Sequence, residues 1–111
     1  HYTFNGLMSL RYLFLNNNKL KLIKDYYFLQ LKSLETLDLF KNQISKIEAN
    51  TFKKFENVLN ALDWSENCLY KITKGLFLNL MKTKELYLQF NEIKSIESDS
   101  FQSLESLATL D

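Results

Sequence analysis

The stretch LNALDWSENCLYKI, residues 59–72, places apolar side chains at fixed distances from Asn67. The same arrangement surrounds three other asparagines, Asn18, Asn42 and Asn91, so that the four asparagines lie 24, 25 and 24 residues apart. Aligned on these asparagines, the chain shows the pattern LxxLxLxxNxLxxIxxxxFxxL four times. A fixed period of this length is typical of a protein built from stacked repeats.

The aligned columns extend over the whole chain of 111 residues. We predict one array over 1–111, with a partial repeat at 1–9, repeats at 10–33, 34–58, 59–82 and 83–106, and a partial repeat at 107–111. The second repeat has one extra residue near Glu56, Asn57 and Val58. The apolar columns include Leu13, Leu37, Leu62 and Leu86; Leu15, Leu39, Trp64 and Leu88; Phe4, Phe28, Phe52, Phe77 and Phe101; and Leu7, Leu31, Phe55, Leu80 and Leu104.

Leu62 and Trp64 flank Asp63, so apolar and polar side chains alternate here. This alternation predicts a short strand with one buried face. Strands one period apart, with the same inward face, are expected to stack in parallel and to form one continuous core. The asparagine column lies where each strand ends, and its amides are expected to satisfy backbone groups of the turn. The phenylalanine column is expected to fill the opposite, convex side.

The pattern resembles the leucine-rich repeat, in particular the typical 24-residue class of Toll and Toll-like receptor ectodomains, Slit-type guidance proteins, lamprey variable lymphocyte receptors and insect immune proteins. The segment Leu62–Asn67 is close to the LDLSxN form of that class, and Ile72 to Leu80 matches its IxxGxFxxL half. The resemblance implies an α/β leucine-rich-repeat solenoid. Such a solenoid is a curved right-handed stack with a parallel sheet on its concave face and mostly irregular or short helical turns on its convex face.

Proteins of this kind usually close both ends with caps, and cysteine-rich caps are usual outside the cell. The sequence shows no cap, so we expect a segment of a longer array. Trp64 and Thr83 depart from the leucine expected in their columns. Local repacking beside the longer repeat is our main interpretation, and a contact of Trp64 with a ligand is the alternative.

The composition excludes several classes of function. With 14 basic and 13 acidic residues, the net charge of +1 gives no electrostatic reason to expect a nucleic acid or an anionic membrane as partner. A single cysteine, Cys68, and a single histidine, His1, make a disulfide framework, a zinc site and a triad with a histidine base improbable. No apolar run is long enough for a membrane span. We expect no enzyme activity, no cofactor and no bound metal.

Side chains between the strand leucines are expected to face outward from the concave side. Together with their flanks, these positions have three basic and six acidic residues. Large exposed aromatic side chains are common in protein interfaces. Our candidate ligand-binding residues on this side are Tyr12, Phe14, Asp38, Phe40, Asp63, Tyr87 and Phe90.

Two interpretations of these seven residues stay open. They form a face for a protein with a basic or mixed patch, or the aromatic rings only pack on neighbouring strands. The aspartates Asp38, Asp63 and Asp111 are expected to form a solvated stripe rather than a calcium site. Cys68 is either a free structural thiol or forms an interchain disulfide.

The resemblance implies a non-catalytic protein-recognition module within a receptor or adhesion ectodomain, with Toll-like innate immune signalling as the first expectation. Its partner would be a protein ligand or a co-receptor chain, with possible receptor dimerisation and no membrane contact within this segment. An extracellular or cell-surface location is expected. None of the eleven asparagines lies in a glycosylation sequon. The alternatives are a cytoplasmic leucine-rich-repeat scaffold and a structural spacer in a longer array.

Overall fold

The computed structural model describes residues 9–24, 26–28, 30–48, 51–52, 58–73, 75–102 and 104–111. The predictions made for Phe4, Leu7 and Phe55, and for the extra residue at Glu56 and Asn57, lie outside the described residues.

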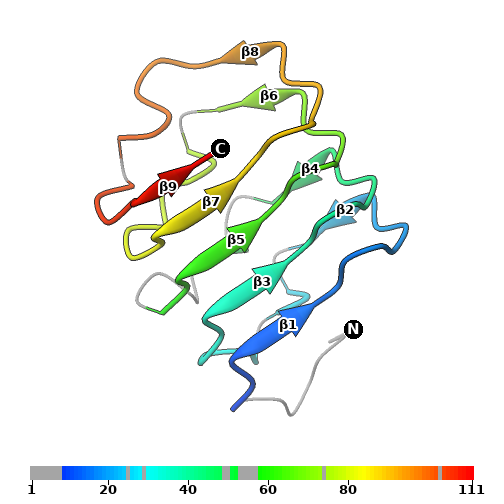
Figure 1. Cartoon of the computed structure of the whole chain (residues 1–111), viewed down its shortest axis with the longest axis vertical. Coiled ribbons are helices and arrows are strands. Elements are labelled where there is room, and N and C mark those ends of the chain that lie inside the picture. Colours follow the sequence, from blue (N-terminus) through cyan, green and yellow to red (C-terminus); the bar gives the residue numbers. More distant parts are fainter. Residues whose placement is uncertain are drawn as a thin grey trace.

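Five short strands form one parallel sheet, in which each strand belongs to a different turn of the coil (Figure 1). The order is β1-β3-β5-β7-β9, with β1 at Tyr12–Phe14, β3 at Thr36–Asp38, β5 at Ala61–Asp63, β7 at Glu85–Tyr87 and β9 at Thr109–Leu110. The register pairs Leu37 with Leu13 and Leu62, so that the leucines of successive strands lie side by side. This is the parallel stack predicted from the period.

A second set of strands follows the asparagine column. Here β2 (Leu22–Ile23) pairs with β4 (Lys46–Ile47), and β6 (Lys71–Ile72) pairs with β8 (Ser95–Ile96). The remaining described residues of each coil are turns and irregular segments, and no helix occurs among them. The predicted leucine-rich-repeat solenoid is therefore confirmed, and its convex side takes the irregular form in every part that the structure describes.

The leucine and phenylalanine columns form the core. Leu37, Leu62 and Leu86 are fully buried, and the rings of Phe28, Phe52 and Phe77 are at most 2% exposed. Phe101 is partly exposed and stacks on Phe77 with 5.6 Å between ring centroids. Each repeat thus covers the apolar side chains of its neighbour, which is why one repeat alone would not be stable.

The asparagine side chains join successive repeats as predicted. Asn67 Nδ2 donates to Leu39 O at 2.8 Å and to Ser65 O at 3.0 Å, while its Oδ1 accepts from Ile44 N at 2.9 Å. Asn42 and Asn91 repeat this arrangement one coil earlier and one coil later. Buried backbone groups that the turn leaves without partners are thereby satisfied.

The two departures from the leucine pattern are both buried. Trp64 and Thr83 are each 0% exposed. Thr83 Oγ1 donates to Leu59 O at 3.0 Å, so its hydroxyl links two repeats in the place of an apolar contact. Burial of both side chains agrees with the repacking interpretation.

Candidate functional site

The strand register places the candidate residues in two neighbouring outward columns. In one column Phe14 pairs with Asp38, Asp38 with Asp63, and Asp63 with Tyr87. Tyr12 begins the other column, which continues through Thr36, Ala61, Glu85 and Thr109. Neighbouring strands lie about 4.8 Å apart, so side chains in one column are adjacent. Phe40 and Phe90 follow their strands by two and three residues.

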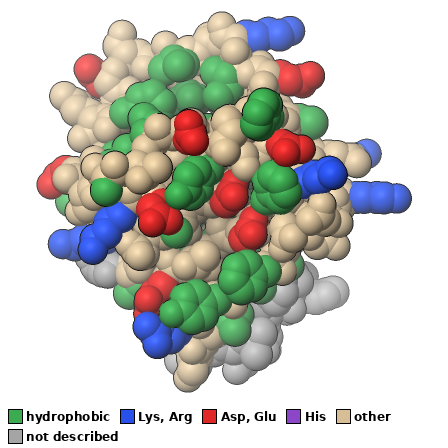
Figure 2. Space-filling view, viewed as in Figure 1, with side chains coloured by type: hydrophobic (Ala, Val, Ile, Leu, Met, Phe, Trp, Pro, Cys, Tyr) green, Lys and Arg blue, Asp and Glu red, His purple; other side chains and the backbone are tan. Residues whose placement is uncertain are grey.

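We call the seven residues Tyr12, Phe14, Asp38, Phe40, Asp63, Tyr87 and Phe90 the concave face. Figure 2 shows hydrophobic and acidic side chains interleaved on the side viewed in Figure 1, with most lysine and arginine side chains at the periphery. Tyr12, Phe14 and Phe90 are 50%, 63% and 78% exposed. Such aromatic area in water is unfavourable unless something covers it.

The aromatic rings of the concave face do not stack on one another. Among these described residues the one ring interaction is that of the Arg11 guanidinium, which lies 5.5 Å from the ring centroid of Tyr12. Phe40 and Tyr87 are half-buried, whereas Tyr12, Phe14 and Phe90 are exposed, so both interpretations of the concave face stay open.

Phe90 combines exposure with an unusual backbone. The residue before each asparagine of the column has a positive φ: 60° at Asn17, 58° at Lys41, 50° at Glu66 and 60° at Phe90. Asparagine tolerates this left-handed conformation, whereas a bulky residue adopts it at a cost. The sequence predicts Phe90 on the concave face but contains no sign of this backbone conformation, because the repeat has a different residue at this place each time.

The aspartates of the concave face have a local structural role. Asp38 Oδ1 accepts from Phe40 N at 2.9 Å, and Asp63 Oδ1 accepts from Ser65 N at 2.9 Å and from Ser65 Oγ at 2.5 Å. Each carboxylate thus closes an Asx-turn at the end of its strand. The sequence contains a signal for these Asx-turns, since each aspartate occupies the last position of its strand, directly before a turn.

Tyr87 lies within an acidic environment. Its hydroxyl donates to Glu85 Oε1 at 3.4 Å. Burial of the phenol, followed by the negative charges of Glu85, Asp63 and Asp111, raises the pKa of Tyr87 above its ordinary value. This part of the face is therefore negative, and it favours a cationic group.

The edge of the sheet near β1 carries an ion pair. Arg11 Nε lies 2.7 Å from Glu35 Oε2, and both side chains are exposed. The hydrogen bond from Arg11 lowers the pKa of the Glu35 carboxyl. This pair neutralises one acidic residue of the surface, so the negative charge concentrates around Tyr87.

Other chemistry has little basis in the described part of the chain. No group of three histidine, cysteine, aspartate or glutamate side chains in the described ranges could hold a metal ion. Cys68 is a half-buried free thiol. None of the described segments forms a helix of the length and apolarity that a membrane crossing needs.

Comparison with solved structures gives closely similar folds. The Drosophila Toll chain in its glycosylated complex with Spatzle superposes with a TM-score of 0.84 and 27% identity, over 90% of this chain and 13% of that chain. A second Toll–Spatzle structure superposes with a TM-score of 0.81 and 28% sequence identity, over 86% of this chain and 13% of that chain. The TLR13 chain in complex with ssRNA13 superposes with a TM-score of 0.54 and 24% sequence identity, over 99% of this chain and 23% of that chain. This likeness concerns the fold alone.

Sequence comparison identifies relatives and the family. Leucine-rich repeat-containing protein 3B from Bos taurus, Mus musculus and Homo sapiens is 35% identical over 68 residues, which are 61% of this chain and 26% of each relative. The chain therefore aligns with about a quarter of the length of these relatives. The family model for the BspA type leucine rich repeat region matches residues 1–111 in six copies. The chain belongs to the BspA-type leucine-rich-repeat family, with a fold like that of the Toll ectodomain.

Proposed function

We propose that this chain is a non-catalytic protein-recognition segment of an extracellular or cell-surface receptor, and that its concave face binds a protein ligand or a co-receptor chain. Innate immune signalling of the Toll-like kind is the proposed context. The family and the similarity to Toll support a recognition module. The solved Toll structures contain Spatzle, which supports a protein as the class of partner.

The observation that carries the proposal is the state of Phe90. Its ring is 78% exposed, and its backbone has a φ of 60°. Both features cost free energy in the isolated chain, and neither contributes to the core. The same φ recurs at Asn17, Lys41 and Glu66, so the backbone conformation belongs to the turn of the repeat, and the exposed ring is the feature that indicates a partner. A partner that covers the ring would recover the cost of exposure.

The charge of the concave face specifies the partner further. Carboxylates at Asp63, Glu85 and Asp111 surround Tyr87, so we expect a protein surface with basic or mixed charge. The low net charge remains our reason to expect no nucleic acid. The fold gives no support to that exclusion, because a chain of similar fold was solved with single-stranded RNA.

Two alternatives have specific support. A structural spacer agrees with the internal hydrogen bonds of Asp38 and Asp63, which serve the turns. A cytoplasmic scaffold agrees with the free thiol of Cys68. Both alternatives leave the exposure of Phe90 without a role.

Photo-cross-linking tests the proposal in the cells that produce the protein. Benzoylphenylalanine in place of Phe90 should give a discrete protein adduct, whereas the same probe in place of Leu78, which is 57% exposed in a turn away from the sheet, should not. The adduct should disappear when Phe40→Ala and Tyr87→Ala are added. The matched pair Leu78→Ala and Ile96→Ala, which removes exposed apolar side chains elsewhere, should retain it.

Circular dichroism and the melting temperature establish that the double variants are folded. An adduct of equal yield from position 78 would contradict recognition through the concave face. An adduct that survives the paired substitution of Phe40 and Tyr87 in a folded chain would do the same.

A further inference from the structure

The second set of strands is interrupted between β4 and β6. Strands β2 and β4 pair, as do β6 and β8, but β4 and β6 belong to different sheets. Between other repeats, Ser45 N donates to Lys21 O at 3.2 Å and Lys94 N donates to Tyr70 O at 2.9 Å. Within the described residues, the equivalent bond from Tyr70 N to Ser45 O is absent. Among the described strands of this set, the coils therefore separate between β4 and β6.

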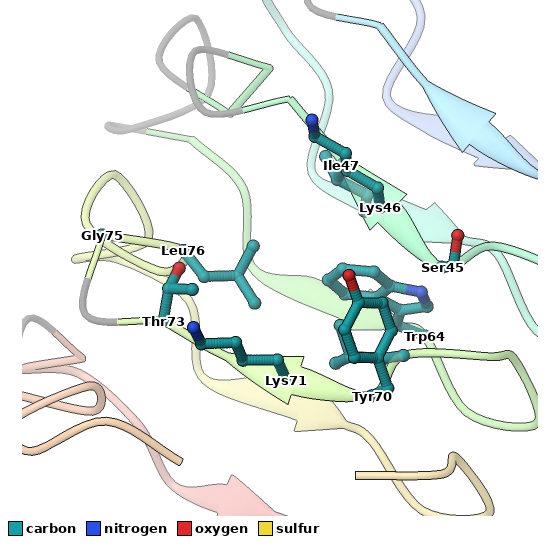
Figure 3. A pocket seen from close by; sticks show the side chains of 10 residues that line it. Ser45, Lys46, Ile47, Trp64, Tyr70, Lys71, Thr73, Gly75 and Leu76 are labelled. Atoms are coloured by element: carbon teal, nitrogen blue, oxygen red, sulfur yellow. The ribbon is translucent and has the colours of Figure 1, made fainter. Parts of the chain in front are cut away.

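Trp64 lies at the separation. It occupies the column in which the other repeats carry Leu15, Leu39 and Leu88, and it is 0% exposed. An indole needs more room than a leucine side chain, and a close-packed interior adjusts to added volume by moving its neighbours. Figure 3 shows the indole between Ser45 on one side and Tyr70 on the other, at the interruption.

The separation leaves a cavity of about 350 Å³. This volume is within the range of small-molecule sites. Ile47, Trp64 and Leu76 supply apolar walls, and Lys46 and Lys71 lie along the rim (Figure 3). The cavity lies on the side of β4 and β6, away from the outward columns of the five-stranded sheet.

The described polar side chains of the cavity are lysines and hydroxyls, all of which can donate hydrogen bonds, although the hydroxyls also accept them. The described residues that line it include two lysines and the hydroxyls of Ser45, Tyr70 and Thr73, with no carboxylate. Lys71 makes a loose ion pair, with its Nζ 3.8 Å from Glu97 Oε2, and both partners are about half exposed. A negatively charged group would therefore meet donors and cations, and at Lys71 it would compete with the loose pair to Glu97.

Trp64 Nε1 is a further donor without an acceptor. This atom is buried and has no hydrogen-bond partner in the structure. An indole N–H in the interior usually has a partner, because loss of its hydration is unfavourable. In Figure 3 the indole nitrogen lies on the side of Trp64 away from Leu76 and Lys71, so the donor-rich wall is the observation that indicates a ligand with acceptor atoms.

We propose that the cavity between β4 and β6 binds a small amphipathic carboxylate, with the apolar part against Trp64, Ile47 and Leu76 and the carboxylate near Lys46 and Lys71. This site is separate from the concave face, so that protein recognition and carboxylate binding can each fail without the other.

Trp64 is the only tryptophan in the chain, so its fluorescence reports on this cavity. Octanoate should change the Trp64 emission in a saturable manner below its micellar concentration. The neutral alcohol 1-octanol should bind about tenfold more weakly, because it lacks the charge that the lysines attract. No saturable change with octanoate would overturn the proposal, and so would equal binding of both probes.

Variants distinguish the cavity from nonspecific binding. Lys46→Gln with Lys71→Gln should weaken octanoate binding about tenfold. The matched pair Lys32→Gln with Lys82→Gln removes two exposed lysines outside the cavity and should leave binding unchanged. Equal effects of both pairs would show that only net charge matters and would refute the site.

Filling the cavity provides a second test that does not depend on the lysines. Leu76→Phe adds volume on the wall that faces Trp64 in Figure 3, and it should abolish the fluorescence response. The melting temperature should stay close to that of the unchanged chain, because the added atoms enter open space. Retained binding in this folded variant would contradict the proposed location.

Discussion

The side-chain amide of Asn67 donates a hydrogen bond of 2.8 Å to the carbonyl oxygen of Leu39, which lies 28 residues earlier in the chain. The same amide also accepts from Ile44 N. One polar side chain thus connects three places on two successive coils. Stability in this molecule depends on such contacts between neighbouring coils.

Asn67→Ala should lower the free energy of unfolding by about 1–3 kcal/mol, because the buried Ile44 N loses its acceptor, while Leu39 O and Ser65 O each lose one of two donors. Asn18→Ala is the control, since Asn18 is exposed and water can replace its bonds to Leu15 O and Asn16 O. Urea unfolding followed by circular dichroism measures both. Equal losses at the two positions would show that burial does not set the contribution of this column.

Phe77→Ala should destabilise the fold by about 3–5 kcal/mol, because it removes a fully buried ring and leaves a cavity beside Phe101. Phe101→Ala should cost less, since Phe101 is partly exposed already. Thermal and urea unfolding of the two variants test the difference. If Phe101→Ala proved the more harmful change, burial of the ring would not set the contribution of each member of the phenylalanine column.

Phe90→Asn should raise the stability of the isolated chain by about 0.5–1 kcal/mol, because asparagine adopts a φ of 60° more readily than phenylalanine. Phe14→Asn is the matched control: it also removes an exposed ring, but from a strand, where asparagine is disfavoured. Denaturant titration provides the measurement. A loss of stability on Phe90→Asn would contradict the strain inferred for this residue.

Tyr87 should ionise above its ordinary pKa of 10.0, because partial burial and the charges of Glu85, Asp63 and Asp111 disfavour the phenolate. The ultraviolet absorbance difference between the unchanged chain and Tyr87→Phe should therefore show a midpoint above pH 10.0. A raised pKa in the folded state favours the protonated form, so its contribution to stability is complete below the unfolded pKa. That contribution is lost as the pH rises through the folded pKa.

Glu85→Gln should bring the Tyr87 midpoint closer to its ordinary value, since it removes a nearby charge and replaces the hydrogen-bond acceptor. Thr109→Gln places an amide on the adjacent strand without removing charge and serves as the control. A Tyr87 midpoint that is unaffected by Glu85→Gln would show that burial alone raises the pKa.

Glu35 should titrate below its ordinary pKa of 4.5, because Arg11 binds the ionised carboxylate. Its contribution to stability is present above the unfolded pKa and is lost as the pH falls through the folded pKa. Carboxyl chemical shifts measured by NMR should show the lowered midpoint, and Arg11→Gln should return it toward 4.5. The shift should also decrease with added salt, since the pair is exposed.

Most of the fold followed from the period of the sequence. The strand register pairs the residues that the alignment on Asn67 had placed in one column, as Asp38 with Asp63 and Asp63 with Tyr87. A repeated sequence places equivalent residues in equivalent surroundings, so that four copies specify one geometry together. The candidate residues of the concave face were found in the same way, and their role in binding stays a prediction.

The left-handed backbone at Phe90 and the cavity at Trp64 could not be found from the repeat pattern. The residue before each asparagine varies, so no side chain marks the positive φ that recurs at Asn17, Lys41, Glu66 and Phe90. The alignment showed that Trp64 departs from its column, but not whether the coils would close around the indole or separate. Periodicity records what the repeats share, whereas the loss of pairing between β4 and β6 depends on the volumes of side chains from two different coils.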